Sequence, residues 1–297
     1  MPDYGFSDYL QLFISGASTG CIYVLIALGL IFIYNVTGVI NLAQGEFAML
    51  GAMLGVVFYK LHLPLGVSAL ISVILVVGIG ALIQRATIYP ARHAPEVSVI
   101  MITIGTAIAV RGLALLIWGT TPYSLPDFTH GSPINLWGAI LSRQRLWIVG
   151  TAAIVLLLLY LFFEFTLLGK AVRACSINRQ TAELAGIDTQ AMAILAYGLG
   201  AGTSAIAGIV IAPLTLVNYN MGLTLGLKGF VVAIMGGMTS APAAVIGGLL
   251  LGILESFTSG LLSSGIKEAV AFVVLFIVLL GRTLPLGELV RHGRRSQ

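Results

Sequence analysis

Long runs of apolar residues, separated by short polar stretches, organise this chain of 297 residues. Most runs are continuous and approach the ~20 residues that a helix needs to cross ~30 Å of hydrocarbon. Strands of a membrane barrel would instead alternate apolar and polar residues in segments of ~10 residues. The pattern predicts an all-α polytopic membrane protein with ~8–9 transmembrane helices, some short or broken. The expected apolar segments are Tyr9–Tyr34, Phe47–Tyr59, Leu65–Gln84, Val97–Trp118, Leu146–Leu168, Ala191–Val217, Gly229–Met238, Ala243–Phe257 and Ile266–Leu280.

Composition supports this class and excludes several others. Hydrophobic residues make up 58% of the chain and charged residues 9%, whereas a soluble domain carries about 25% charge. We therefore expect a single membrane domain over residues 1–297, with no separate soluble domain and no cleavable signal. The four histidines show no metal-ligand spacing, and no P-loop or Ser–His–Asp pattern is present. We expect no enzyme activity, no metal, no cofactor and no nucleic-acid partner.

The positions of lysine and arginine predict the orientation. If residues 169–188 are cytoplasmic and residues 229–238 cross the membrane, nine basic residues face inside and five face outside, and Arg111 lies within a span. This orientation places the N-terminus and the loop of residues 119–145 outside. The inner set is Arg85, Arg92, Lys170, Arg173, Arg179, Arg282, Arg291, Arg294 and Arg295, and the outer set is Lys60, Arg143, Arg145, Lys228 and Lys267.

A polar stretch at residues 169–188 predicts a short helix between two spans. Asn178 suits the N-cap, because its side-chain oxygen can accept a hydrogen bond from the first turn. Gly186 suits the left-handed residue after the helix, and Ile187 supplies the apolar residue that often follows. This helix fits either a docking element for a soluble partner or a solvated surface segment.

Polar residues interrupt the apolar pattern at residues 35–46, where Asn41, Gln44 and Glu46 occur beside glycines. Irregular backbone at membrane depth is tolerated only against protein or a water-filled cavity. These residues therefore either line a solute path or form a cytoplasmic turn in which Glu46 is a first-turn acid. Arg111, in the middle of a span, would contact a substrate carboxylate, extend to the interface, or pair with an acid such as Glu255.

The stretch of residues 226–248 is rich in glycine, alanine and serine, which allow helices to approach closely. We favour tight packing over a role in a solute path for this stretch. Pro242 is expected to end a helix after Thr239 and Ser240.

Three stretches carry a resemblance that covers nearly the whole chain. They are GCIYVLIALGLIFIYNVTGVINLAQGEFAMLGA (Gly20–Ala52), LGKAVRACSINRQTAELAGID (Leu168–Asp188) and GLKGFVVAIMGGMTSAPAAVIGGLLLGILE (Gly226–Glu255). With these three stretches in this order and spacing, the chain resembles the branched-chain amino-acid ABC permeases of the LivH type. The resemblance implies a multi-pass subunit of the bacterial inner membrane with ABC importer permease architecture. It also implies four kinds of partner: a second permease chain, two cytoplasmic ATPase subunits that hydrolyse ATP, a periplasmic substrate-binding protein, and membrane lipid.

The resemblance assigns residues 169–188 as the loop that couples to the ATPase. The matching positions, together with Glu183 inside the short helix, are Gly169, Lys170, Arg173, Ala174, Asn178, Ala182, Gly186 and Ile187. Asn41, Gln44, Glu46 and Arg111 remain the candidates for the substrate path.

Two positions depart from the family pattern. Gln44 stands where the family commonly has histidine, and Ala243 where it commonly has glycine. Gln44 is one of the candidate path residues, so its departure leaves the identity of the transported solute undecided. The candidates are branched-chain amino acids, other amino acids, amides, urea and aromatic acids. A sugar permease of the same importer class and a self-sufficient secondary transporter are the alternatives.

Overall fold

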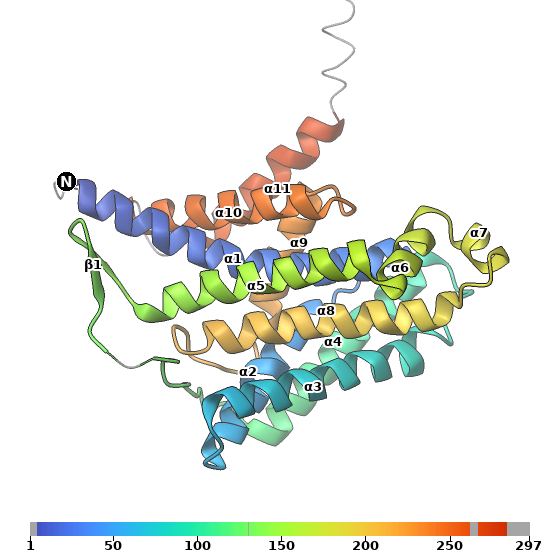
Figure 1. The fold of residues 1–297 in the computed structure, drawn as a ribbon, viewed down its shortest axis with the longest axis horizontal. Coiled ribbons are helices and arrows are strands. Elements are labelled where there is room, and N and C mark those ends of the chain that lie inside the picture. The colour runs from blue at the N-terminus through green and yellow to red at the C-terminus, as the bar shows by residue number, and fades with distance from the viewer. Residues whose placement is uncertain (1–4, 130, 262–266, 284–297) are drawn as a thin grey trace, which may run out of the picture.

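The computed structural model describes residues 5–129, 131–261 and 267–283, and most of these residues are helical (Figure 1). A π-helical turn, Gln84–Ile88, extends α3, and strands β1 (Ile134–Leu136) and β2 (Ala139–Leu141) form an antiparallel hairpin. The helices are α1 (Phe6–Thr37), α2 (Gln44–Lys60), α3 (Leu65–Ile83), α4 (Glu96–Trp118), α5 (Arg143–Phe165), α6 (Leu167–Ile177), α7 (Arg179–Leu184), α8 (Thr189–Ile211), α9 (Met221–Met235), α10 (Ala241–Leu261) and α11 (Lys267–Thr283).

Within the described residues, six helices are long and apolar enough to cross a membrane: α1, α3 with its π-helical turn, α4, α5, α8 and α10. Helices α2, α9 and α11 are shorter, with 17, 15 and 17 residues. The predicted class, an all-α polytopic membrane protein with some short helices, is confirmed. Ile266 and the tail arginines Arg291, Arg294 and Arg295 lie outside the described residues.

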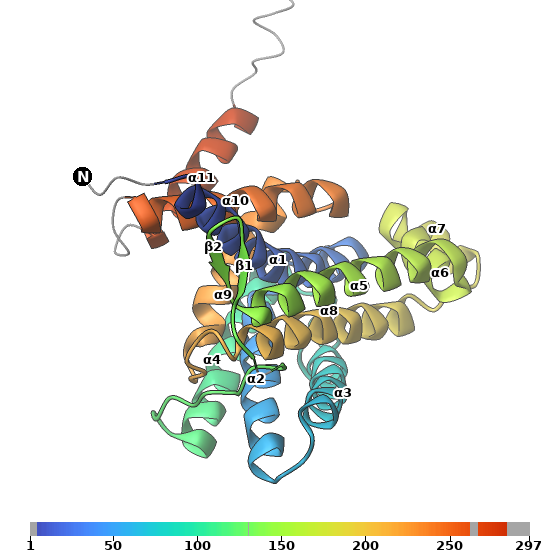
Figure 2. The same ribbon diagram turned by 60° about the vertical axis from the view of Figure 1, so that its left-hand side comes forward.

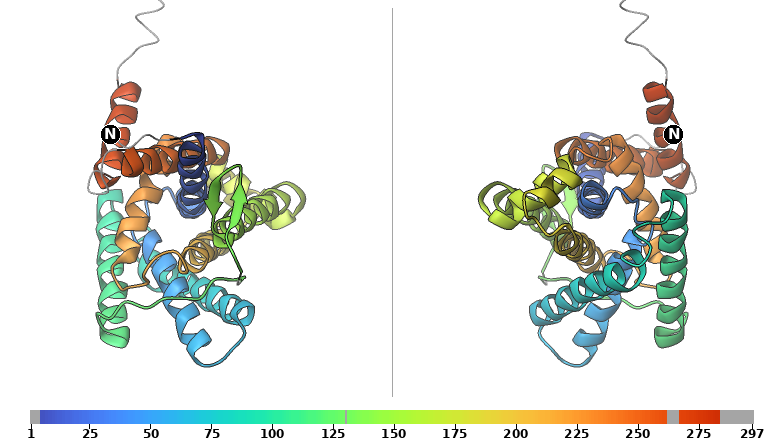
Figure 3. Two further views of the ribbon diagram at one scale, coloured as in Figure 1. Left: turned by 90° about the vertical axis from the view of Figure 1, so that its left-hand side faces the viewer. Right: turned by 90° about the vertical axis from the view of Figure 1, so that its right-hand side faces the viewer.

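Helices α1 and α8 form the centre of the bundle. The most apolar windows of these two helices are 83% and 78% buried, whereas those of α3, α4 and α5 are only 17–28% buried. Helix α10 runs beside α1, and the short helices α2 and α9 cross the bundle (Figures 1 and 2). Viewed end-on, α4 and α11 lie at the periphery (Figure 3). The core therefore consists of two nearly enclosed helices surrounded by helices with one open face.

The open faces of the peripheral helices are apolar. Leu70, Leu116 and Ile154 are 60–83% exposed on α3, α4 and α5. Soluble monomers rarely expose continuous apolar surface of this kind, and hydrocarbon is the solvent in which it is stable.

Glycine contacts bring the central helices together. A Cβ on Gly208 of α8 would lie 1.9 Å from the carbonyl oxygen of Ala48 on α2. In the glycine-rich stretch of residues 226–248, a Cβ on Gly229 would lie 2.5 Å from the Ile26 side chain, and one on Gly248 2.5 Å from that of Val24. Small residues permit this backbone approach, and the packing that we favoured for this stretch is present.

The two ends of the bundle differ. Helices α6 and α7 project at one end, and the β hairpin lies at the other (Figure 1). The hairpin turns at Trp137 and Gly138, both with positive φ, 51° and 88°, which is the two-residue turn compatible with strand twist. The expected polar loop of residues 119–145 therefore contains a hairpin, and α5 begins within it at Arg143.

Three sequence-based boundaries are wrong. Pro242 does not end a helix, because α9 ends at Met235 and Pro242 lies in the first turn of α10. Helix α6 occupies residues expected to be loop, because the apolar Val172 and Cys175 lie three positions apart and form a buried face beneath the charged residues. Helix α9 begins at Met221 rather than near Gly229. Lys228 is consequently a buried residue of α9, 7% exposed, and not an outer loop base.

Candidate functional site

Caps at both ends define the short helix α7. The Asn178 side chain accepts a hydrogen bond from the amide of Thr181 at 3.0 Å. Gly186 follows the helix with φ +84°, a conformation that glycine adopts without steric cost. The two caps predicted from sequence are confirmed.

Helix α6 has a similarly defined start. The Thr166 hydroxyl accepts from the amide of Gly169 at 2.9 Å. A Cβ on Gly169 would lie 2.2 Å from the carbonyl oxygen of Phe162, at the end of α5. Only glycine fits this contact, so α6 is held closely against α5.

One face of this segment packs on the bundle. Ala182 is 4% exposed and joins Val172 and Cys175 in an apolar cluster. Val36 at the end of α1 and Met192 on α8 complete the contact, and Ala174 and Ile187 pack against its edge. This apolar cluster therefore joins α6 and α7 to the end of α1 and the start of α8.

The opposite face is open and partly apolar. Leu184 is 90% exposed and Ile177 82% exposed. Lys170 is also exposed. Arg173 pairs with Glu164 at 3.2 Å, and Arg179 with Glu183 at 3.5 Å, with about half of each side chain exposed. We call the exposed surface of α6 and α7 the coupling surface, after the role that the resemblance implies for residues 169–188.

Glu183 has a second partner, because the Thr189 hydroxyl donates to Glu183 Oε1 at 2.6 Å. This hydrogen bond, followed by Arg179, lowers the pKa of the Glu183 carboxyl below its ordinary value. Glu183 therefore links α7 to the first turn of α8 in its ionised form.

The interrupted stretch of residues 35–46 folds back into the bundle. Helix α1 continues to Thr37, and Gly38 ends it with φ +72°. The chain then returns along α1, so that a Cβ on Gly29 would lie 2.2 Å from Gln44 Nε2. Because Gly29 precedes Gly38 by nine residues, α2 begins about 13 Å back from the end of α1. Gln44 and Glu46 are consequently buried in the first turn of α2. The expected position of Glu46 as a first-turn acid is confirmed, but this turn is enclosed by the bundle.

The polar side chains of this break bind one another and α8. Gln44 Nε2 donates to the carbonyl oxygen of Gly200 at 2.8 Å and to the Ser204 hydroxyl at 2.7 Å. Asn41 Oδ1 accepts from the amide of Ala43 at 3.1 Å. Asn41, Gln44 and Arg111 line a cavity of about 300 Å³ between α1, α4 and α9.

Arg111 pairs with Glu46 rather than with Glu255. Its Nε donates to Glu46 Oε1 at 3.2 Å, and a second guanidinium nitrogen contacts the same oxygen. The pair joins the peripheral helix α4 to α2, and Arg111 remains 21% exposed while Glu46 is 2% exposed. Three of the four path candidates thus line one cavity, and Glu46 pairs with Arg111 at its edge.

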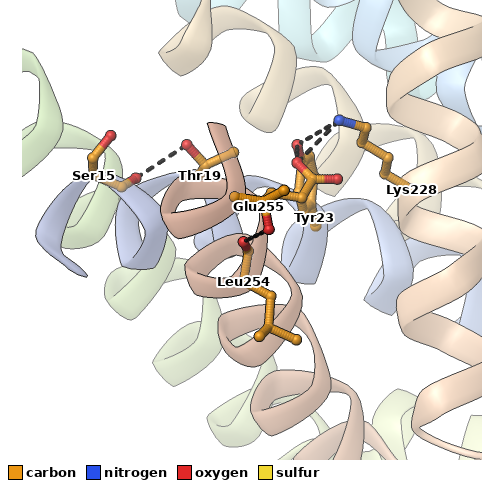
Figure 4. Close-up of polar contacts among 7 residues, drawn as sticks. Ser15, Thr19, Tyr23, Lys228, Leu254 and Glu255 are labelled. Atoms are coloured by element: carbon orange, nitrogen blue, oxygen red, sulfur yellow. Dashed lines mark hydrogen bonds and ion pairs between the residues drawn. The ribbon is translucent and has the colours of Figure 1, made fainter. Parts of the chain in front are cut away.

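A second buried charge pair, Lys228 with Glu255, was not predicted from the sequence. Lys228 Nζ donates to Glu255 Oε2 at 3.0 Å and to the Tyr23 hydroxyl at 3.2 Å, and that hydroxyl donates to the same carboxylate oxygen at 2.7 Å (Figure 4). The three residues come from α9, α10 and α1. The sequence signal was present, because a lysine and a glutamate inside apolar runs have to pair or shift their protonation. The expected segment began only at Gly229, whereas α9 begins at Met221, so Lys228 was assigned to an outer loop and its pairing with Glu255 was not predicted.

Tyr23 and Lys228 line a cavity that has a volume of about 820 Å³. We call it the outer chamber. It lies between α1, α5, the connection from α8 to α9, and α9, in the half of the bundle that carries the hairpin. Its other polar lining residues are Ser15, Thr19, Arg145, Thr215, Asn218, Asn220 and Thr224.

Comparison with known proteins places this architecture in a family. A family model described as the permease component of branched-chain amino acid transport systems matches residues 12–279. The LivH permease protein of the high-affinity branched-chain amino acid transport system of Salmonella typhimurium is 31% identical, over 96% of this chain and 97% of that protein. The corresponding BraD protein of Pseudomonas aeruginosa is 29% identical, over 95% and 96%. The galactofuranose transporter permease protein YtfT of Escherichia coli is 30% identical, over 66% of this chain and 58% of that protein. The chain therefore belongs to the family of branched-chain amino acid transport permease components.

Proposed function

We propose that the chain is the membrane-spanning subunit of an ATP-binding-cassette importer that moves branched-chain or related amino acids inward by alternating access. The observation that carries the proposal is the coupling surface. A short helix with two caps presents the exposed Leu184 at one end of the bundle and packs its other face, through Ala182, on α6 and α8. Exposed apolar side chains on a rigid helix favour protein docking.

The proposed partners follow from the two ends of the molecule. Two ATPase subunits bind at the coupling surfaces of two permease chains on the cytoplasmic side of the bacterial inner membrane. A periplasmic substrate-binding protein docks at the hairpin end, where Trp137 is 81% exposed and Ile140 59% exposed. Lipid covers the apolar outer faces of the peripheral helices, and ATP hydrolysis resides on the partner subunits.

Within this proposal, Asn41, Gln44 and Arg111 contribute polar groups to the solute path, and Glu46 fixes the position of Arg111 at its edge. Arg111→Ala and Gln44→Ala are expected to lower the uptake rate or alter which amino acids compete for uptake. If both variants take up solute at the parent rate and with the same competition by amino acids, the assignment of these residues to the solute path is wrong.

The coupling surface is tested with the complex purified with its partner subunits and reconstituted in lipid. Leu184→Arg is expected to abolish most substrate-stimulated ATP hydrolysis and to weaken retention of the ATPase, because it places a charge in the docking contact. Leu61→Arg is the matched control, since Leu61 is 65% exposed and lies at the turn after α2. Equal ATPase activity in the two variants would refute the docking assignment. Uptake by the chain alone, driven by an ion gradient, would replace the proposal with a secondary transporter.

A further inference from the structure

The outer chamber has an unbalanced charge at its surface. Arg145 and Lys228 are the two cationic residues that line it, and its described lining includes no acidic residue. The charge of Lys228 is compensated from behind by Glu255, which is fully buried and does not face the chamber. The chamber therefore presents one uncompensated positive charge, that of Arg145.

Arg145 is held in place while part of its guanidinium stays available. Its Nη1 donates to the carbonyl oxygen of Ser15 at 3.2 Å and to the Ser18 hydroxyl at 3.1 Å. No described acid pairs with Arg145, and among the described residues its Nε and Nη2 have no hydrogen-bond partner. A fixed guanidinium with two free donors suits bidentate binding of a carboxylate.

The position of Arg145 strengthens the positive potential. It occupies the first turn of α5, which begins at Arg143 and has no side-chain cap. The helix dipole already makes this end positive, so a base here is unfavourable unless an anion is bound. The dipole and the side chain therefore attract the same kind of ligand.

The rest of the chamber suits a small amphipathic solute. Ser15, Thr19 and Tyr23 recur every four residues and so lie on one face of α1, and Figure 4 labels all three along this helix. This face leads from the outer part of α1 to its middle. Ile148, Ile211 and Leu225 supply apolar wall on the other helices. A volume of about 820 Å³ lies within the range of small-molecule sites.

Building on the proposed function, we propose that the outer chamber binds the transported solute through its carboxylate, with Arg145 as the anchor. The solute class is a small monocarboxylic amino acid whose apolar side chain lies against Ile148, Ile211 and Leu225. A neutral sugar offers no group for Arg145 and is bound more weakly. Arg145 thus determines specificity within the permease itself, in addition to any selection by a binding protein.

A chemical probe tests the charge of the chamber without any binding protein. The complex carries Thr224→Cys, which lines the chamber, in a background of Cys21→Ala and Cys175→Ala, and is held in lipid nanodiscs at low ionic strength. The rate of labelling by a sulfonate-bearing methanethiosulfonate is compared with that of its trimethylammonium counterpart, each rate being divided by the rate of the same reagent with a free thiol in solution, because the cationic reagent reacts faster with any thiolate. We expect the anionic reagent to be favoured about threefold or more, and Arg145→Gln to remove most of that preference.

The control is Arg143→Gln, because Arg143 lies two residues earlier on α5 but donates to Ser132 and lines a different cavity. We expect it to leave the preference unchanged. Arg145→Lys retains the charge and is expected to keep the reagent preference while losing protection by leucine, because an ammonium cannot form the bidentate contact.

Protection from labelling identifies the ligand class. Millimolar leucine is expected to slow labelling of Thr224→Cys, and ribose at the same concentration is not. Equal rates for the two reagents, an Arg145→Gln variant that keeps the preference, or protection by ribose as strong as that by leucine would each overturn the proposal. Substrate-stimulated ATP hydrolysis of the parent complex is measured separately and reports on the proposed function alone.

Discussion

The bundle interior and the coupling surface hold their charged residues in different ways. Inside the bundle, the Lys228–Glu255 pair is 9% and 0% exposed and the Arg111–Glu46 pair 21% and 2% exposed. At the coupling surface, the pairs of Arg173 with Glu164 and of Arg179 with Glu183 are 44–53% exposed. Breaking a buried pair leaves an unsolvated charge and costs several kcal/mol, whereas an exposed pair contributes about 0–1 kcal/mol. The interior therefore determines stability, and the coupling surface can change with little effect on the fold.

The largest effect is expected for the most enclosed pair. Glu255→Gln leaves the Lys228 ammonium buried without a counter-charge, which should destabilise the protein by about 3–5 kcal/mol. Thermal unfolding in detergent measures the loss as a lower apparent melting temperature. The double variant Lys228→Met plus Glu255→Gln removes both charges and should recover much of the stability. If Glu255→Gln alone is as stable as the parent, water reaches the Lys228–Glu255 pair, and this pair does not differ in energy from the exposed pairs at the coupling surface.

A smaller effect is expected for the pair that joins α4 to α2. Glu46→Gln leaves Arg111 unpaired, but Arg111 is 21% exposed and can turn toward the adjoining cavity. We expect a loss of about 1–3 kcal/mol, less than for Glu255→Gln, in the same unfolding assay. Arg111→Met plus Glu46→Gln is the matched control. A loss of stability as large as that of Glu255→Gln would mean that the burial of the remaining base, Arg111 or Lys228, does not determine the free-energy cost of breaking the pair.

The same contrast explains which features could be predicted from sequence. The caps of α7 are local, because Asn178 and Gly186 act on residues within a few positions, and both predictions are confirmed. The helix pattern and the membrane class also follow from local hydrophobicity. The interior pairs join residues 65 and 27 positions apart, and one sequence does not reveal which acid meets which base. The sequence therefore suggested Glu255 as one possible partner of Arg111. In the structure the chain returns along α1 to Gly29, and this return brings Glu46 to Arg111 instead.

Removing the cap of α7 should alter the coupling surface without unfolding the protein. Asn178→Ala deletes the hydrogen bond to the Thr181 amide and should cost α7 about 1 kcal/mol. Because short segments open locally, faster hydrogen exchange in α7 is expected, with an unchanged melting temperature. Gln180→Ala, at an exposed position of the same helix, is the control. A lower melting temperature for Asn178→Ala would show that α7 unfolds with the interior and that the two regions are not energetically separate.

The smallest effect is expected from the pH dependence of the link between α7 and α8. The Thr189 hydroxyl, then Arg179, lowers the pKa of Glu183 below its ordinary value, so the ionised form is favoured when α7 is folded. A carboxyl with a lowered pKa stabilises the folded segment above its ordinary pKa, and that contribution is lost as the pH falls through the folded value.

Hydrogen exchange in α7 should therefore be insensitive to this link from pH 7 to about pH 5, after correction for intrinsic exchange. Below about pH 4.5 exchange should rise, and Glu183→Gln should abolish the rise. About half of the Glu183 side chain is exposed, which makes this a local effect, so the buried pairs should dominate any acid unfolding of the whole bundle. A global loss of stability that disappears in Glu183→Gln would instead place the acid-sensitive contact at the coupling surface and reverse the assignment of stability to the interior.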